Sequence, residues 1–363
     1  MPSPMLESDL YRPPTALGAV VINGRGKVGV LRVLVLGGNR YIGLSLVREL
    51  AGQGFDVTVA NSHVVNLPHG VDRVHVDRRD PTALVDALAP HARSFDVVFD
   101  NTAYQVADLE PLVELFDGHI RRYVFTSSVA VYRRSYVQPV AEHFRLHEVV
   151  ADEPLRAYGV GKVLCERFLA DRFARTGFPV TSVRVSHTIG PRSPLVDREP
   201  ILFARLEQGR PIFIPGDGFP FVHLIHIDDA ARLLVALATS ERATGEVFNA
   251  AGLELTSILG CIHLMARTVG VDPDIVFVPT PIARQLLYPL LHWGEGLAGG
   301  AVFSMAKTLA ATNWKPRFGL ESAYQDSYAW FRDAGREGYD YRFDHDDEIL
   351  ALVGRNQPDR LPD

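Results

Sequence analysis

Short apolar runs alternate along the first half of the chain with segments whose apolar residues recur at helical spacing. "RVLVLGG" precedes "GLSLVRELAGQG", in which Leu44, Val47 and Leu50 are spaced as on one helix face, and "DVTVAN" follows. The alternation continues through "DRVHVD", "DPTALVDALA", "DVVFDN", "LEPLVELFDG" and "RYVFTSS". Buried strands joined by helices predict an α/β fold of the Rossmann type, with a doubly wound parallel sheet covered on both faces.

The first of these strands leads into a glycine-rich turn, "GGNRYIG". Its glycines lie between a strand and a helix, where backbone N–H groups and the helix N-terminus bind a diphosphate. Arg40 occupies the position that usually holds the middle glycine. We interpret its guanidinium as a partner for the adenosine phosphates, with a solvent-facing side chain as the alternative. The predicted cofactor-binding turn comprises Gly37, Gly38, Asn39, Arg40, Tyr41, Ile42 and Gly43.

The end of the second strand bears on the choice of cofactor. A NAD-binding site commonly places a carboxylate there to hold the ribose 2′-hydroxyl, whereas this chain has Ala60, Asn61, Ser62 and His63. No acid stands at this point to repel a 2′-phosphate, and Asn61 is the candidate contact. We therefore predict NAD(P) as the cofactor and favour NADP, with NAD left open.

The segments "YVFTSSVAVY" and "AYGVGKVLCERF" carry the candidate catalytic groups. Tyr158 and Lys162 are four residues apart on one face of a predicted helix. A nearby ammonium lowers the pKa of a tyrosine from about 10 toward neutrality, and Ser128, which ends a predicted strand, can hydrogen-bond the same substrate oxygen. Such a pair also arises by chance, but its place after a glycine turn and a serine-ending strand favours a catalytic role.

With these motifs, residues 31–335 resemble the extended short-chain dehydrogenases/reductases, a family of NAD(P)-dependent nucleotide-sugar epimerases, dehydratases and reductases. "GGNRYIG", "DNTAYQ" and "RYVFTSSVAVY" are most similar to an atypical branch that includes chloroplast stem-loop-binding proteins and bacterial epimerase-like reductases. The resemblance implies that Ser128 hydrogen-bonds the substrate, Tyr158 transfers a proton, and Lys162 contacts the nicotinamide ribose. It also implies that Asp77 contacts the adenine amino group of the cofactor. Arg78, which follows Asp77, and Ala103 are further implied cofactor contacts.

The same resemblance extends to "SVRVSHTIGP", which matches the family's Arg-Pro-x-x-x-Tyr-Gly-Pro run. Arg184 matches its arginine, while Val185 and Ile189 replace the proline and the tyrosine. His187 stands where many members place a substrate-contacting asparagine, with a packed loop histidine as the alternative. Because Val222 replaces an arginine that binds the diphosphate in sugar-nucleotide epimerases, the candidates for that charge are Arg192, Arg205 and Arg210. His226, Asp228 and Asp229 match a family signature and are interpreted as structural.

The residues after Ser128 bear on the reaction. Sugar 4,6-dehydratases of the family carry an Asp-Glu pair there, whereas this chain has Val129 and Ala130. Dehydration is therefore the least favoured activity, which leaves epimerisation or net reduction of a sugar-like or nucleotide-linked substrate. The alternative is a non-catalytic or RNA-binding protein on the same scaffold, which the net charge of -6 disfavours.

Composition sets the remaining expectations. With 363 residues, 47% of them hydrophobic, the chain can bury a large core in one big domain or two intimate ones. We predict a loose extension over 1–30, a cofactor domain over 31–184 completed by 223–252, a substrate lobe over 185–222 and 253–335, and a tail over 336–363. The two cysteines lack metal-ligand spacing and suit a reducing compartment, so we predict a cytoplasmic protein without a metal site.

No segment predicts export or membrane insertion. The N-terminus lacks the basic start and apolar core of a secretory signal, and the apolar stretch 282–303 is interrupted by Arg284, Pro289 and Glu295. We therefore expect a small-molecule partner and neither nucleic acid nor membrane, and we leave a homodimer open.

Overall fold

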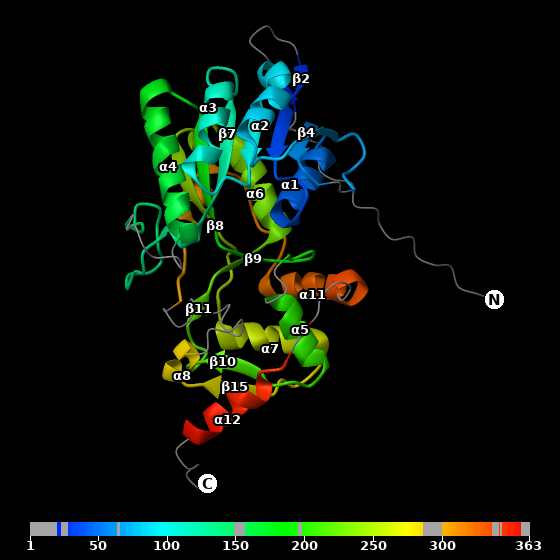
Figure 1. The fold of residues 1–363 in the computed structure, drawn as a ribbon, viewed down its shortest axis with the longest axis vertical. Helices are drawn as coiled ribbons and strands as arrows, with labels where there is room; N and C mark the ends of the chain where they lie inside the picture. The colour runs from blue at the N-terminus through cyan, green and yellow to red at the C-terminus, as the bar shows by residue number, and fades with distance from the viewer. Residues whose placement is uncertain are drawn as a thin grey trace, which may run out of the picture.

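A seven-stranded, wholly parallel sheet forms the upper part of the molecule in Figure 1. The computed structural model describes residues 20–22, 28–63, 66–148, 157–194, 198–285, 300–335, 341 and 343–356. The sheet order is β13-β8-β7-β6-β3-β4-β5. The strands are β3 (Arg32–Leu36), β4 (Asp56–Asn61), β5 (Asp72–His75), β6 (Val97–Asp100), β7 (Arg122–Ser128), β8 (Val180–Val185) and β13 (Glu246–Ala250). This order confirms the predicted doubly wound sheet of the Rossmann type.

Helices cover both faces of this sheet, as the alternation of strands and helices predicted. In β3, Val33 and Val35 belong to one apolar core, and Leu34 and Leu36 belong to the other. Both sets are fully or almost fully buried, which explains why the strand is a continuous apolar run rather than an alternating one. The helices are α1 (Tyr41–Gly52) and α6 (Ile227–Thr239) on one face, and α2 (Pro81–Leu88), α3 (Glu110–Phe116) and α4 (Ala157–Thr176) on the other.

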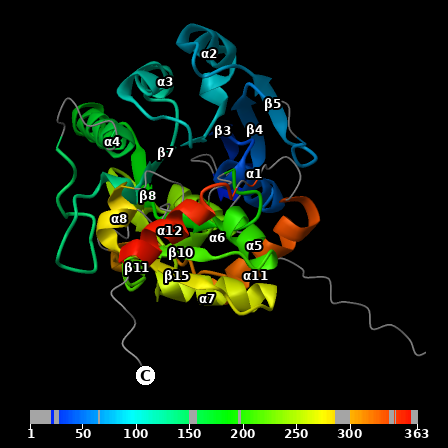
Figure 2. The ribbon, with the colours of Figure 1, turned by 60° about the horizontal axis from the view of Figure 1, so that its bottom comes forward.

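A smaller lobe lies beyond the carboxyl ends of the parallel strands, as Figure 1 and Figure 2 show. Its core packs Phe203, Met265 and Tyr324 between three helices. The chain enters it from β8 through β9 (His187–Ile189) and returns through β12 (Leu224–His226), which pairs with β9. The other elements of the lobe are α5 (Glu199–Glu207), β10 (Ile212–Pro215), β11 (Phe221–Val222), β14 (Thr256–Ser257), α7 (Ile258–Val269), β15 (Ile275–Val278), α8 (Thr280–Gln285), α11 (Leu320–Trp330) and α12 (Asp346–Asn356). Helix α10 (Ala306–Ala311) lies instead against β13 of the main sheet, where Oγ1 of Thr308 donates a hydrogen bond to the carbonyl oxygen of Asn249.

The two ends of the chain add details that the hydrophobic pattern did not predict. β1 (Val20–Ile22) and β2 (Val28–Val30) pair as an antiparallel hairpin within the segment expected to be a loose extension. In the expected tail, Ile349 and Val353 of α12 are buried against the lobe. The rest of 1–30 and most of the stretch 282–303 lie outside the described residues. No helix in the described part of the chain is long and apolar enough to cross a bilayer. The domain boundaries proposed from the sequence stay a prediction.

Candidate active site

The glycines of the turn lie too close to neighbouring atoms for any of them to carry a side chain. Gly37 has a left-handed φ of 82°, and a Cβ there would lie 2.2 Å from Cγ2 of Thr102. A Cβ on Gly43 would lie 2.0 Å from the carbonyl oxygen of Gly37. Because backbone rather than side chains faces the start of α1, the turn fits the close approach of a diphosphate to a helix N-terminus. Arg40 is the exposed residue that precedes α1, and its side chain makes no capping hydrogen bond.

The other residues of the turn contribute mainly to its packing. Tyr41 adopts a φ of 45°, and its buried hydroxyl donates a 2.7 Å hydrogen bond to the carbonyl oxygen of Thr188. Burial raises the pKa of Tyr41, so the phenol stays protonated. Asn39 and Ile42 are half-buried, and Gly38 has no room for a Cβ beside Val47 and Val59. Tyr41 therefore offers a cofactor its backbone and not its hydroxyl.

Two buried N–H groups at the end of β4 face no acceptor among the described residues. Asn61 is 7% exposed, and its Oδ1 accepts a 2.9 Å hydrogen bond from Nε of Arg73. Nδ2 of Asn61 and Nη2 of Arg73 are buried without a hydrogen-bond partner in the described part of the chain. Buried donors ordinarily find acceptors, so a ligand that supplies oxygen atoms fits this position.

Asp77 and Arg78 are adjacent but have different surroundings. Asp77 is near the surface, where hydrogen bonds from the side chain and backbone of Arg79 lower its pKa to about 2. Arg78 turns under the end of β6 and forms an ion pair with Asp100, whose carboxylate is fully buried. Nη1 of Arg78 also donates a 2.8 Å hydrogen bond to Oγ1 of Thr102. Only Asp77 of this pair is therefore placed at the surface, where an adenine ring could reach it.

Lys162 is held inside the protein by two carbonyl oxygens. It is 2% exposed, and Nζ donates 2.7 Å hydrogen bonds to the carbonyl oxygens of Ala103 and Thr126. Nζ also lies 4.8 Å from the ring centroids of Tyr104 and Phe125. Burial lowers the pKa of Lys162 to about 8. An ammonium has three N–H groups, so one remains for a ribose hydroxyl or a substrate oxygen.

Tyr158 and Ser128 lie on the same side of Lys162. Tyr158 is in the first turn of α4, and its ring centroid lies 5.9 Å from Nζ of Lys162. Tyr158 is 48% exposed, and the partial desolvation of its phenol raises its pKa, an effect that a hydrogen bond with Ser128 opposes only in part. The expectation that the ammonium lowers this pKa is therefore wrong, because the Lys162 N–H groups that the structure places are directed at carbonyl oxygens. The structure thus brings the three predicted catalytic residues together.

Two glycines that sequence reasoning missed let α4 approach this site. A Cβ on Gly159 would lie 2.3 Å from the carbonyl oxygen of Ala130, and one on Gly161 would lie 2.4 Å from that of Tyr104. Each glycine therefore lets the helix rest directly on one of the two loops around Lys162. Their spacing in "YGVGK" was the available signal, since glycine inside a helix is destabilising unless packing requires it.

A buried ion pair supports the other side of the site. Nη2 of Arg184 lies 2.6 Å from Oε2 of Glu166, and each of the two side chains is 4% exposed. Oγ of Ser127 donates a 2.6 Å hydrogen bond to Oε1 of Glu166, which joins α4 to the end of β7. Nη1 of Arg184 donates to the carbonyl oxygen of Glu142. Arg184 therefore has a structural role beside the site.

The candidates for substrate binding are not all brought to one place. His187 is half-buried on β9, at the entrance to the smaller lobe. Arg192 follows Gly190 with a left-handed φ of 63°, and burial lowers its pKa. Arg205 is 4% exposed, and its guanidinium is paired with Asp346 of α12 at 2.7 Å. Because Asp346 already neutralises the charge of Arg205 inside the lobe, His187 and Arg192 remain the candidates for substrate binding.

The "HIDDAAR" segment has the structural role that its sequence indicated. His226 precedes α6, and its Nδ1 accepts a 3.2 Å hydrogen bond from the backbone N–H of Asp228. The carboxylate of Asp229 accepts hydrogen bonds from the backbone N–H groups of Arg317 and Phe318. These contacts fix the return of the chain from the smaller lobe to the main sheet.

Two relatives of known sequence are similar to this chain over more than half of its length. The chain is 28% identical over 344 residues to the chloroplast stem-loop binding protein of 41 kDa b of Arabidopsis thaliana, which covers 88% of this chain and 84% of that protein. It is 30% identical over 220 residues to 2′-dehydrokanamycin reductase of Streptomyces kanamyceticus, which covers 59% of this chain and 60% of that protein.

Solved structures and a family model complete the comparison. The fold is similar to that of UDP-glucose 4-epimerase from Thermotoga maritima with UDP-glucose, with a TM-score of 0.70 and 20% identity over 84% of this chain and all of the other. It is also similar to UDP-glucuronic acid 4-epimerase from Bacillus cereus with NAD, with a TM-score of 0.69 and 18% identity over 86% of this chain and all of the other. The model of the NAD dependent epimerase/dehydratase family matches residues 33–251. The chain therefore belongs to this family of nicotinamide-dependent enzymes.

Proposed function

We propose that the chain is an epimerase or a reductase that acts with NAD(P) on a carbinol or ketone carbon of a sugar-like or nucleotide-linked substrate. The observation that carries this proposal is the meeting of Ser128, Tyr158 and Lys162 at the carboxyl ends of β6 and β7. When bound beside these residues, the nicotinamide would supply the hydride chemistry. Names of relatives that include a reductase and a sugar-nucleotide decarboxylase support this class of substrate.

Each of the three residues has one task in this proposal. The Tyr158 hydroxyl exchanges a proton with the substrate oxygen, and Ser128 donates a hydrogen bond to the same oxygen. Lys162 offers its remaining N–H group to the ribose of the cofactor or to a substrate oxygen. Because partial desolvation raises the pKa of Tyr158, the phenol is protonated near neutrality and is ready to donate to an oxygen that gains negative charge.

NADP is the cofactor that the adenosine end favours. Nδ2 of Asn61 and Nη2 of Arg73 are donors without acceptors among the described residues, and a 2′-phosphate supplies acceptor oxygens. The exposed Arg40 adds a cation at the start of α1, and no carboxylate stands at the end of β4. A ribose hydroxyl of NAD would satisfy fewer of these donors.

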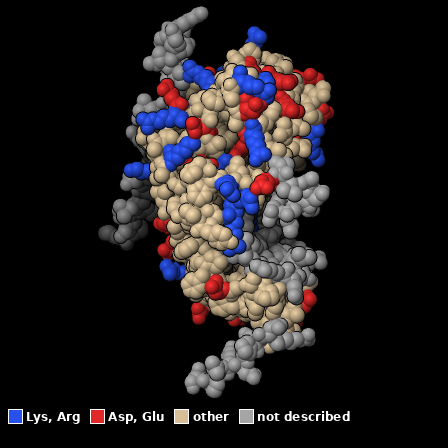
Figure 3. Space-filling model, turned by 90° about the vertical axis from the view of Figure 1, so that its left-hand side faces the viewer, with Lys and Arg blue, Asp and Glu red and all other residues tan. Residues whose placement is uncertain are grey.

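The nucleic-acid alternative has less support, although one relative is named a stem-loop binding protein. The net charge is -6, and on the face in Figure 3 acidic and basic side chains are interleaved over the sheet domain. A phosphate backbone is ordinarily bound by a coherent basic surface. A cytoplasmic location and a homodimer stay predictions, which cell fractionation and light scattering test.

An isotope experiment tests the enzyme and distinguishes its two forms. Sugar nucleotides and free sugars deuterated at the reacting carbon are incubated with the protein and NADP and analysed by mass spectrometry. An epimerase gives a product that keeps its deuterium while bulk cofactor stays unlabelled, whereas a reductase run in the oxidative direction gives labelled NADPH. If neither transfer occurs with any substrate and RNA binds at physiological salt, the proposed function is overturned in favour of an RNA-binding protein.

A further inference from the structure

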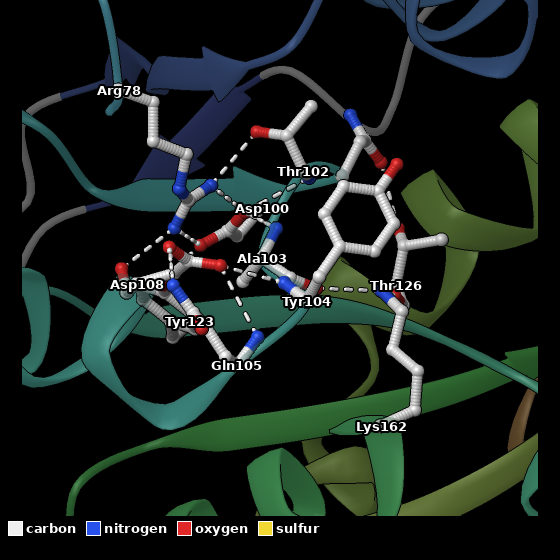
Figure 4. Close-up of polar contacts among 11 residues, drawn as sticks. Arg78, Asp100, Thr102, Ala103, Tyr104, Gln105, Asp108, Tyr123, Thr126 and Lys162 are labelled. Carbon is white, nitrogen blue, oxygen red and sulfur yellow. Dashed lines mark hydrogen bonds and ion pairs between the residues drawn. The ribbon is translucent and has the colours of Figure 1, made fainter. Parts of the chain in front are cut away.

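Asp100 collects five hydrogen bonds beneath the loop that holds Lys162 (Figure 4). Its carboxylate accepts from both Nη atoms of Arg78 and, at 2.6 Å, from the Tyr123 hydroxyl. It also accepts 3.1 Å hydrogen bonds from the backbone N–H groups of Thr102 and Ala103. Although burial opposes ionisation, the ion pair with Arg78 holds the pKa of Asp100 below its usual value. Asp100 therefore fixes the peptide groups on both sides of Thr102.

Arg78 fixes the same loop at two more points. Nη1 donates to Oγ1 of Thr102 at 2.8 Å, and Nη2 donates to the carbonyl oxygen of Asp108 at 2.7 Å. The carboxylate of Asp108 in turn accepts from the backbone N–H group of Tyr104 at 2.8 Å. Residues 100–108 are thus held at both ends and in the middle by one guanidinium that comes from the loop after β5.

We propose that Arg78 and Asp100 are positioning residues that act on the reaction through Lys162, by fixing the Ala103 carbonyl oxygen to which its ammonium is bonded. This inference rests on the proposed function, because it assumes that Lys162 serves the hydride-transfer site. It gives Arg78 a role different from direct contact with the cofactor. Four of its five N–H groups are directed at protein acceptors, and only the fifth, on Nε, is buried without an acceptor among the described residues.

The electrostatic surroundings of Lys162 support the same link. Burial lowers the pKa of Lys162, and the charge of Asp100 is the largest influence that opposes this effect. Asp100 therefore both places the ammonium, through Ala103, and keeps it protonated. The titratable and charged groups around Lys162 are Asp100 from β6, Arg78 from the loop after β5, Cys165 and Glu166 from α4, and the phenols of Tyr104 and Tyr158.

The composition of the chain allows a direct test that needs no substrate. There are four lysines, Lys27, Lys162, Lys307 and Lys315, so lysine labelled with ¹³C at Cε gives four NMR signals. The Lys162 signal is assigned by its loss in Lys162→Met. We expect Asp100→Asn to lower the pKa of Lys162 by about one unit, since the carboxylate charge that favours the ammonium is removed. An unchanged Lys162 titration would overturn the proposal.

Turnover and cofactor affinity provide the second readout, with the substrate that the isotope experiment identifies. Asp100→Asn should lower kcat about 10²-fold and leave the Kd for NADP, measured by calorimetry, within a factor of three. Thr102→Val, which removes one acceptor of Arg78 and preserves side-chain shape, should lower kcat about fivefold. This milder variant keeps the test valid if Asp100→Asn does not fold. Asp346→Asn breaks a buried pair in the smaller lobe and should lower stability alone.

The outcomes separate this inference from the proposed function. A loss of NADP affinity at unchanged kcat would make Arg78 a cofactor contact and overturn the positioning role. A loss of stability alone, as in Asp346→Asn, would also overturn it. If Tyr158→Phe keeps its turnover, the proposed function fails, whatever the result for Asp100. If Tyr158→Phe is inactive and the Asp100 and Thr102 variants keep both kcat and the Lys162 titration, only the positioning inference fails.

Discussion

Two buried ion pairs, Arg78 with Asp100 and Arg184 with Glu166, are connected to Lys162 through different parts of the structure. On the side where we propose that the cofactor binds (the cofactor side), Arg78 and Asp100 contact Lys162 only through the backbone of the 100–104 loop. On the side where we propose that the substrate binds (the substrate side), Glu166 is one turn further along the same helix, so its pairing with Arg184 fixes α4 itself. The first pair fixes the acceptor of the ammonium, and the second fixes the helix that carries the ammonium.

The first pair acts on a loop and the second on a helix, which explains why the 100–104 loop makes so many hydrogen bonds. A loop has no repeating ladder of its own, and each buried N–H group needs an acceptor. Asp100 supplies acceptors for two consecutive N–H groups, whereas α4 satisfies its backbone internally. Disturbing the cofactor side should therefore alter turnover through geometry, and disturbing the substrate side should alter stability first.

The largest expected effect is on the proton step itself. Tyr158→Phe removes only the hydroxyl and should lower kcat about 10²- to 10⁴-fold, the usual contribution of a general acid or base. Calorimetry should give an NADP affinity close to that of the wild type. Near-normal turnover in this variant would remove Tyr158 from the mechanism.

The next largest effect is a loss of stability when the Arg184–Glu166 pair is broken. Arg184→Met leaves Glu166 buried without its partner and should lower the free energy of unfolding by about 3–5 kcal/mol, measured by urea denaturation. The double variant Arg184→Met/Glu166→Leu, which replaces both members of the ion pair, should recover most of that loss. The matched control is Arg172→Met, whose pair with Asp117 has side-chain exposures of 28% and 29% and should cost less than about 1 kcal/mol. Equal losses in the two single variants would contradict this account.

Lys162 itself should give stability a recognisable pH dependence. Its pKa is about 8 when folded, below about 10.4 when unfolded, so between these values the unfolded chain binds more protons. The contribution of Lys162 to stability therefore rises by about 3 kcal/mol as the pH increases through this window. Lys162→Met should lack this rise in urea denaturation at pH 7.5 and 10. Lys307→Met, with a surface lysine, provides the background, and parallel curves for all three proteins would exclude the effect.

The sequence predicted what depends on local spacing. The sheet followed from apolar runs such as "RVLVL", and the pairing of Tyr158 with Lys162 followed from their separation of four residues on a helix. Both patterns are confined to a single strand or helix. For that reason the fold and the proximity of the proposed catalytic residues could be predicted from the sequence alone.

What the sequence did not predict depends on contacts between distant segments. Arg78 and Asp100 are 22 residues apart, and only the β5–β6 arrangement shows that the guanidinium pairs with the Asp100 carboxylate. Arg205 meets Asp346 across 141 residues. The predicted lowering of the Tyr158 pKa was wrong because Lys162 is bonded to carbonyl oxygens and partial desolvation raises that pKa, neither of which the spacing reveals.

The smallest expected effect concerns the adenosine end of the cofactor side. Arg40 is exposed, so its charge is partly screened, and Arg40→Ala should raise the Kd for NADP about tenfold and that for NAD by less. Arg73→Met should discriminate more sharply between the two cofactors than Arg40→Ala, because its buried Nη2 has no acceptor among the described residues. Titration calorimetry of both cofactors against both variants measures the difference, with kcat at saturating cofactor as the control. Equal losses for NAD and NADP in Arg40→Ala would place its guanidinium on the shared diphosphate. No loss in either variant would leave Asn61 as the remaining candidate for the ribose and would remove the preference for NADP.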